Sequence, residues 1–206
     1  MPIIGQTLGV REEGGKPLIE CLRDYLREKK ILIVLDNFEQ ITEAAPPIGE
    51  LLSGSQNLKI LVTSRVRLNL QFEREFTLQP LEVPTDERLT ANEFGKYPAV
   101  ELFVKRAKAA KFDFALTEEN AASIAEICRR LDGLPLAIEL AAVRVKLLAP
   151  AAILKRLEHS LNLLTGGAKD LPERRQTMRG AIAWSYDLLD ADEKKCSIVC
   201  RCFAAV

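Results

Sequence analysis

The sequence has 206 residues, of which 48% are hydrophobic and 28% are charged, so it holds enough apolar material for a folded core. Its 29 Lys and Arg residues balance 29 Asp and Glu residues, which excludes a strongly basic nucleic-acid coat or an acidic disordered tail. No uncharged apolar run approaches the roughly 20 residues of a membrane span, and no secretory signal pattern begins the sequence. We therefore expect a cytoplasmic protein without membrane contact.

The five cysteines are an odd number and, without a secretory signal, they do not indicate a disulfide framework. Cys196, Cys200 and Cys202 lie close together, but no second pair of Cys or His residues stands at a spacing usual for zinc. We expect these three to be small apolar residues of a terminal helix.

The N-terminal part of the chain has the pattern of an α/β region. Helices are expected within the first 30 residues. Two aliphatic runs, residues 31–35 and 59–63, each stop at a polar residue and predict strands that are buried on both faces. Because residues 39–52 between them have helical character, the three segments predict a parallel βαβ unit. Residues 75–78 predict a third, weaker strand.

The pattern changes after Pro84. Residues 85–97 are polar and predict a loop, whereas the segments from Pro98 onward predict helices. Further helices are expected to begin near Pro150 and to extend over residues 172–189 and 191–204.

A sharp corner between two helices is predicted in the middle of this helical region. Thr117 is placed to cap a helix over residues 118–131, Gly133 is placed to end it, and Pro135 suits the first turn of the next helix. Spacing alone leaves open whether this corner also contacts a nucleotide base.

Two residues at the ends of the predicted strands are candidates for ligand chemistry. Asp36 follows the first strand, with Asn37 and Glu39 nearby, and a carboxylate at the C-terminal end of a parallel strand can hold Mg²⁺, usually through water. Arg65 follows the second strand, from which a cation can reach a terminal phosphate. The alternatives are that Asp36 caps a turn and that Arg65 is a solvated cation.

Several segments of the sequence together resemble one known family. ILIVLDNFEQ, KILVTSR, RRLDGLPLAIELAA and LLTGGAKDLPERRQTMRGAIAWSYDLLD occur in this order, and the match runs from about Gly5 to about Leu189. They resemble the bacterial NB-ARC-type STAND ATPases, which are nucleotide-driven switches often found in large transcriptional regulators of the LuxR and AfsR kinds.

The resemblance implies roles for four residues and a set of cofactors. Asp36 corresponds to the Walker B acid, a catalytic residue that holds Mg²⁺. Arg65 corresponds to the sensor arginine, which is catalytic and contacts the nucleotide. Leu134 and Pro135 belong to the GLPL segment, whose proline lies near the adenine. In the complete family protein the cofactors are ATP or ADP with Mg²⁺.

The resemblance also implies a fold class of α/β followed by all-α. We expect an incomplete P-loop NTPase-type parallel sheet over residues 1–84, in which the P-loop strand is absent. A helical bundle is expected over residues 85–167, and the truncated start of a winged-helix domain over residues 168–206.

The sequence departs from the family in the phosphate-binding loop. ATP binding requires G-x-x-x-x-G-K-[ST], and no segment of the 206 residues matches it. In residues 9–17, GVREEGGKP, the first glycine is one position too far upstream, Pro17 replaces the Mg²⁺-binding hydroxyl, and Glu12 and Glu13 would repel phosphate. We therefore expect the chain alone to bind nucleotide weakly or not at all, and not to hydrolyse it.

These observations favour a fragment or truncated relative of an ATP/ADP-binding signal-transduction switch of a transcriptional regulator. Its expected partners are the missing N-terminal P-loop segment or other domains of a larger regulator. The alternative, which the missing loop favours, is a non-catalytic protein-interaction module derived from the same fold. We expect no direct DNA binding, because the net charge is zero and the resemblance implies that the wing and a recognition helix are missing or truncated.

The missing P-loop strand leads to a prediction about one edge of the sheet. The strand at residues 60–63 should expose unpaired backbone groups along that edge. Either residues 75–78 pair with it or copies of the chain associate through it, and we expect the first.

Overall fold

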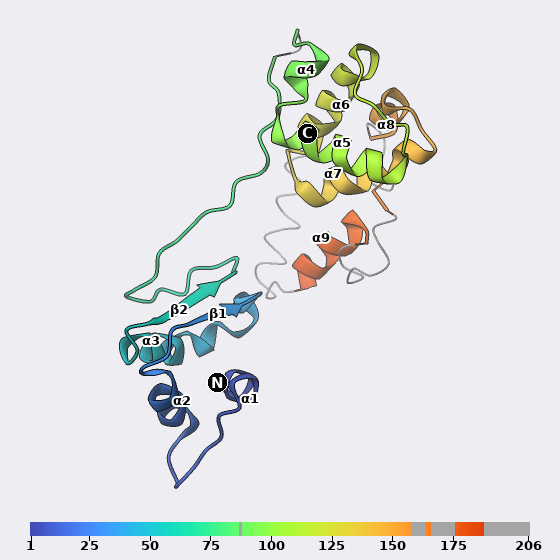
Figure 1. Ribbon diagram of the computed structural model, residues 1–206. Helices are drawn as coiled ribbons and strands as arrows, with labels where there is room; N and C mark the ends of the chain where they lie inside the picture. Colours follow the sequence, from blue (N-terminus) through green and yellow to red (C-terminus); the bar gives the residue numbers. More distant parts are fainter. Residues whose placement is uncertain (87, 158–163, 166–175, 188–206) are drawn as a thin grey trace, which may run out of the picture. The chain divides into compact units, whose positions relative to one another are not determined.

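The computed structural model describes residues 1–86, 88–157, 164–165 and 176–187 (Figure 1). The chain forms two compact units, Met1–Thr77 and Leu78–Val206, and each has its own hydrophobic core. The three predicted domains, with divisions after residues 84 and 167, stay predictions.

The first unit is built around two parallel strands. Residue Ile31 lies opposite Leu58 and Leu35 lies opposite Val62, in one continuous register. The predicted βαβ unit is therefore confirmed, with the second strand shifted one residue toward the N-terminus. In chain order, the elements of this unit are α1 (Pro2–Leu8), α2 (Leu18–Leu26), β1 (Ile31–Leu35), the 3-10 helix η1 (Phe38–Ala44), α3 (Ala45–Ser53) and β2 (Leu58–Val62).

Helices cover one face of this sheet. In Figure 1, α2 and α3 lie on the same side of β1 and β2. Burying one large aliphatic side chain in this layer stabilises the fold by about 1.5–3 kcal/mol. The fully buried helical residues of this core are Leu22, Leu26 and Leu51, with Ile48 nearly so, and the strand residues packed against them are Ile31, Ile33, Leu35, Ile60 and Val62.

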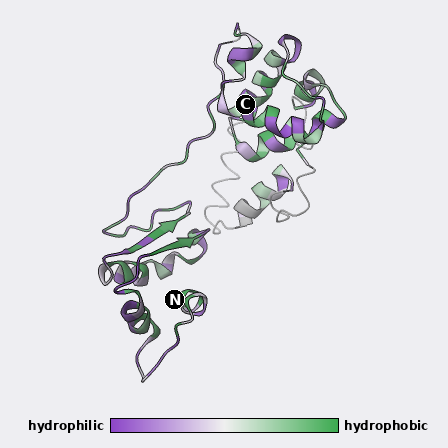
Figure 2. Ribbon diagram, viewed as in Figure 1, coloured by the Kyte–Doolittle hydropathy of each residue, from purple (hydrophilic) through white to green (hydrophobic). Residues whose placement is uncertain are grey.

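The opposite face of the sheet is exposed, although, apart from Lys59, its residues are also apolar. Leu32, Val34 and Leu61 are 60%, 58% and 56% exposed, and both strands are largely hydrophobic, with Lys59 the charged residue of β2 (Figure 2). The prediction that the strands are buried on both faces is therefore wrong. A sheet with helices on one face alternates between buried and exposed side chains, and the described helices of this unit form no second layer on it.

The predicted third strand at residues 75–78 is wrong. These residues have no regular secondary structure, and Phe76 and Leu78 are 85% and 82% exposed. Just upstream, the Glu73 carboxylate accepts hydrogen bonds from the backbone N–H groups of Leu68, at 3.0 Å, and Leu70, at 3.2 Å. These bonds, that of Leu68 first, lower the pKa of Glu73. The backbone N–H groups of Leu68 and Leu70 are thus satisfied within a local loop that precedes residues 75–78.

The edge of β2 is consequently not paired as expected. Among the described residues the sheet has the order β1–β2, so β2 has one strand neighbour. The expected pairing of residues 75–78 with residues 60–63 does not occur in the structure. Association of copies through this edge stays a prediction.

The second unit is helical, as predicted from Pro98 onward for the described residues. Phe103, Ile124 and Ile138 are completely buried and belong to its main core. Its helices are α4 (Ala91–Phe94), α5 (Pro98–Ala110), α6 (Glu118–Arg130), α7 (Pro135–Ala142), the 3-10 helix η2 (Val143–Lys146), α8 (Pro150–Leu157) and α9 (Met178–Asp187).

Helix α4 lies within the segment predicted to be a loop, and that prediction is wrong. The Glu93 carboxylate accepts a hydrogen bond from the Thr90 N–H at 2.8 Å, and the Glu93 N–H donates to Thr90 Oγ1 at 3.4 Å. This reciprocal capping box stabilises a single helical turn in a polar sequence.

Of the predicted helix over residues 172–189, residues 172–175 and 188–189 lie outside the described residues, and Gln176 and Thr177 are not helical. Thr177 forms an antiparallel bridge with Thr165, and α9 begins only at Met178. The predicted helix over residues 191–204 lies outside the described residues, as do Cys196, Cys200 and Cys202. The described part of the chain contains no group of three side chains that could hold a metal ion.

The corner after α6 confirms the predicted roles of Thr117, Gly133 and Pro135. The Thr117 N–H donates to Asn120 Oδ1 at 3.0 Å in a capping box, and Pro135 begins α7. Gly133 has a positive φ of 66° and its carbonyl accepts a hydrogen bond from the Leu81 N–H at 3.0 Å. A Cβ on Gly133 would lie 2.1 Å from the Leu81 carbonyl oxygen. This close approach of two backbones requires glycine.

Replacing Gly133 with Ala should destabilise the protein by about 2 kcal/mol or more, because a left-handed φ costs a non-glycine residue about 1 kcal/mol and the clash with Leu81 adds to it. Urea unfolding followed by circular dichroism measures the loss. Gly9→Ala is the matched control, since Gly9 also follows a helix with a positive φ, 71°, but has no heavy atom within 4 Å of the added Cβ. Equal losses in the two variants would contradict the role of the Leu81 contact.

Candidate functional site

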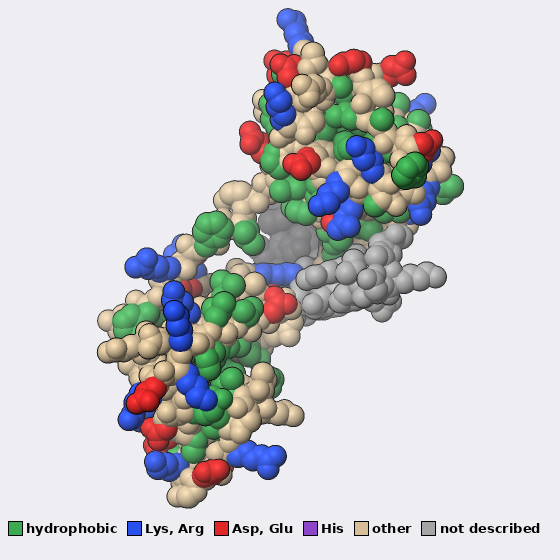
Figure 3. Space-filling view, in the orientation of Figure 1, with side chains coloured by type: hydrophobic (Ala, Val, Ile, Leu, Met, Phe, Trp, Pro, Cys, Tyr) green, Lys and Arg blue, Asp and Glu red, His purple; other side chains and the backbone are tan. Residues whose placement is uncertain are grey.

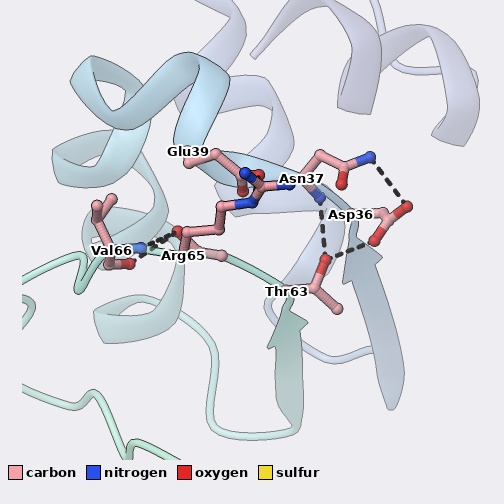
Figure 4. Close-up of polar contacts among 7 residues, drawn as sticks. Asp36, Asn37, Glu39, Thr63, Arg65 and Val66 are labelled. Carbon is pink, nitrogen blue, oxygen red and sulfur yellow. Dashed lines mark hydrogen bonds and ion pairs between the residues drawn. The ribbon is translucent and has the colours of Figure 1, made fainter. Parts of the chain in front are cut away.

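The candidate site lies where the two parallel strands end. Asp36 directly follows β1, and Thr63 and Arg65 follow β2, so all three lie at the same edge of the sheet (Figure 4). The prediction that Asp36 and Arg65 lie at the C-terminal ends of adjacent parallel strands is confirmed. This is the edge at which open α/β sheets bind their ligands.

Hydrogen bonds of the main chain continue past the ends of the strands and fix this geometry. The Thr63 N–H donates to the Leu35 carbonyl at 2.9 Å, and the Phe38 N–H donates to the Thr63 carbonyl, also at 2.9 Å. Phe38 is 2% exposed and anchors the start of η1 in the core. The backbone that carries the site residues is therefore held on both sides.

Thr63 joins the two strand ends through its hydroxyl group. Thr63 Oγ1 donates to Asp36 Oδ1 at 2.5 Å and accepts a hydrogen bond from the Asn37 N–H at 3.0 Å. The Asn37 side-chain amide donates to Asp36 Oδ2 at 3.2 Å. Asn37 has a positive φ of 56°, a conformation that asparagine adopts more readily than most residues. Both carboxylate oxygens of Asp36 are thus oriented by neighbouring residues.

Arg65 is oriented by an acidic residue from the other strand end. Its Nε lies 3.5 Å from Oε1 of Glu39, which is in η1. The Arg65 side chain is 48% exposed, whereas that of Glu39 is 10% exposed. Next to Arg65, Ser64 Oγ donates to the Val66 carbonyl at 2.7 Å and accepts from the Val66 N–H at 3.2 Å, which makes a tight turn.

The side chains at this edge of the sheet provide some of the groups that bind a magnesium nucleotide. The Asp36 carboxylate and the Thr63 hydroxyl provide the oxygen atoms that Mg²⁺ prefers, often through water. The planar guanidinium of Arg65 matches phosphate oxygens. The remaining requirement is a loop that surrounds the phosphates, and no segment of the sequence has its pattern.

The structure agrees with the exclusion of residues 9–17 as a phosphate loop. This segment connects α1 to α2, so a helix and not a strand precedes it. Lys16 Nζ forms an ion pair with Asp24 Oδ2 at 3.4 Å. The segment therefore lacks the strand-to-helix setting of a phosphate loop.

Leu134 and Pro135 lie in the second unit, at the corner where α7 begins. Leu134 is 39% exposed, and its N–H donates to the Leu131 carbonyl at 2.9 Å. Their structural role in the turn is evident, and their contact with a nucleotide stays a prediction.

Two residues of the site were not given roles on the basis of the sequence. Thr63 stands within the LVTSR segment, and Glu39 was noted only as lying near Asp36. The parallel register is the signal that places Thr63 beside Asp36, because the residue that follows Val62 lies next to the residue that follows Leu35.

Charges of both signs are interspersed on the surface. On the face shown in Figure 3, Lys and Arg side chains alternate with Asp and Glu side chains in both units. The described surface thus provides no extended basic patch on this face.

None of the described helices combines the length and the apolar character needed to cross a membrane.

Comparison with known proteins relates most of the chain to part of larger regulators. It is 37% identical over 190 residues, 92% of its length, to proteins of Mycobacterium tuberculosis and Mycobacterium bovis that bear the name "Putative HTH-type transcriptional regulator". It is 36% identical over 189 residues to a further M. tuberculosis protein, which is named as uncharacterized. No family model matches the chain, and no solved structure matches it.

The matched region is a minor part of these relatives. It covers 20% of the length of the named regulators and 45% of the length of the uncharacterized protein. The comparisons therefore show similarity to one region of transcriptional regulators.

Replacing Thr63 with Val should destabilise the protein by about 1–2 kcal/mol, because the change keeps the shape but removes the hydroxyl that joins Asp36 to Asn37. Urea unfolding measures the difference. Thr42→Val is the matched control, since Thr42 is exposed in η1 and the described residues show no hydrogen bond to its side chain. If Thr63→Val unfolds at the same urea concentration as the control, the hydroxyl does not hold the strand ends together.

Proposed function

We propose that this chain is the nucleotide-responsive switch region of a transcriptional regulator of the NB-ARC-type STAND class. The observation that carries the proposal is the convergence of Asp36, Thr63 and Arg65 at one edge of a parallel strand pair. The similarity to part of proteins named as transcriptional regulators supports the regulatory role. We place this role in the cytoplasm.

In this proposal the two strand ends have different tasks. Asp36, oriented by Thr63 and Asn37, would hold Mg²⁺ through water. Arg65 contacts the terminal phosphate and so distinguishes ATP from ADP by one phosphate group. A bound magnesium nucleotide would supply the charge to which these residues respond. Because a ligand shifts a conformational equilibrium only through different affinities for the two states, Arg65 is the residue that links nucleotide identity to conformation.

A complete site of this kind needs a glycine-rich loop from another polypeptide segment. Backbone N–H groups and a lysine of such a loop hold the phosphates, and the 206 residues contain no such motif. Other domains of a larger regulator are the proposed partners. We do not expect this chain to bind DNA directly.

The second candidate function is a non-catalytic interaction module. The observation that favours it is the exposure of Leu32, Val34 and Leu61 on one face of the sheet, beside Lys59. Exposed apolar groups that lie together often mark interaction sites. In this alternative, Asp36 and Arg65 stabilise the strand ends and bind no nucleotide.

Calorimetric titration with Mg-ATP and Mg-ADP separates the two candidates when it is done with and without a phosphate loop. For the 206-residue chain we expect binding no tighter than millimolar, and Asp36→Ala should leave it nearly unchanged. In a polypeptide that joins this chain to a glycine-rich phosphate loop, Asp36→Ala should weaken Mg²⁺-dependent binding about tenfold or more. Glu43→Gln, which removes an exposed negative charge in η1, is the control. If Asp36→Ala has no effect in the joined polypeptide, the nucleotide switch is excluded.

A further inference from the structure

Glu39 is a nearly buried carboxylate whose charged partner is Arg65. It is 10% exposed in its side chain, and its Oε1 lies 3.5 Å from Arg65 Nε. A carboxylate taken out of water loses solvation free energy unless a cation lies beside it. Arg65 therefore offsets the burial of Glu39, and Glu39 in turn fixes the direction of the Arg65 side chain.

The position of Glu39 is set by the backbone and not by its own hydrogen bonds. Phe38, its neighbour, is 2% exposed and donates its N–H to the Thr63 carbonyl at 2.9 Å. Glu39 Oε2 is buried, and none of the described residues donates a hydrogen bond to it. A buried acceptor without a donor is uncommon in folded proteins and calls for an explanation beyond packing.

The ion pair connects the end of β1 to the end of β2. Glu39 comes from η1, after β1, and Arg65 follows β2 (Figure 4). The negative charge beside the guanidinium lowers the positive potential that Arg65 presents at the edge of the sheet. An anion that approaches this edge must compete with the Glu39 carboxylate for Arg65.

We propose that Glu39 is a positioning residue that holds Arg65 at the strand edge and restrains its binding of anionic phosphate groups. Where the anion is the terminal phosphate of a nucleotide, this role of Glu39 rests on the function proposed above for the chain. Glu39 thus regulates the contact between Arg65 and phosphate. The Arg65 guanidinium stays paired with the Glu39 carboxylate until an anion takes the place of that carboxylate.

The first experiment observes Arg65 without any ligand. In nuclear magnetic resonance spectra, the Nε–Hε signal of Arg65 should exchange slowly with water in the wild type. In Glu39→Gln, which keeps the size of the side chain and removes its charge, the exchange should become several times faster. Glu43→Gln removes a charge from the same 3-10 helix at an exposed position and should leave the signal unchanged. An Arg65 signal that is the same in Glu39→Gln and in the wild type would overturn the proposal.

The second experiment measures the affinity for inorganic triphosphate by calorimetry. Glu39→Gln should bind it about three- to tenfold more tightly than the wild type, whereas Glu43→Gln should be close to the wild type. When Arg65 is replaced by Ala, the additional change Glu39→Gln should give no such gain. Tighter binding that persists without Arg65 would overturn the proposal, as would binding by Glu39→Gln no tighter than by Glu43→Gln.

The two experiments separate failure of this inference from failure of the proposed function. If Arg65→Ala binds triphosphate, titrated into the millimolar range, as tightly as the wild type and as Glu39→Gln, the proposed phosphate contact of Arg65 is contradicted. The exchange of the Arg65 Nε–Hε signal then still decides whether Glu39 positions Arg65.

Discussion

The parallel pairing of β1 with β2 is the constraint on which the candidate site depends. Its register sets Leu35 opposite Val62, and so the next residues, Asp36 and Thr63, meet at the same edge. A slip of one residue would turn every side chain of one strand to the other face of the sheet. The Thr63 N–H bond to the Leu35 carbonyl belongs both to the sheet and to the site. Stability of the strand pair and geometry of the site are therefore coupled.

Local patterns in the sequence were sufficient to predict most elements of the fold. The aliphatic runs marked both strands, and the residues around Gly133 and Pro135 marked the corner between α6 and α7. The absence of the third strand could not be predicted in this way, because a short apolar run forms a strand only when a neighbouring strand pairs with it, and pairing depends on tertiary structure. Burial of both sheet faces was also mispredicted, because the number of layers on a sheet depends on distant parts of the chain.

The sequence predicts those residues of the site whose positions depend only on where the strands end. Asp36 and Arg65 each come directly after, or shortly after, an aliphatic run, and parallel strands bring such residues together. The roles of Thr63 and Glu39 depend on side-chain directions, which aliphatic patterns do not encode. The nucleotide contact of Leu134 and Pro135 rests on resemblance to a family, whereas their part in the turn follows from local physics.

The Glu39–Arg65 ion pair and the Asp36–Thr63 hydrogen bond both need the same strand arrangement, which can be measured directly. Nuclear Overhauser effects between residues 31–35 and 58–62 should show a parallel pattern with Leu35 near Val62, together with a slowly exchanging Thr63 amide. An antiparallel pattern, or a rapidly exchanging Thr63 amide without contacts between the strands, would contradict the account.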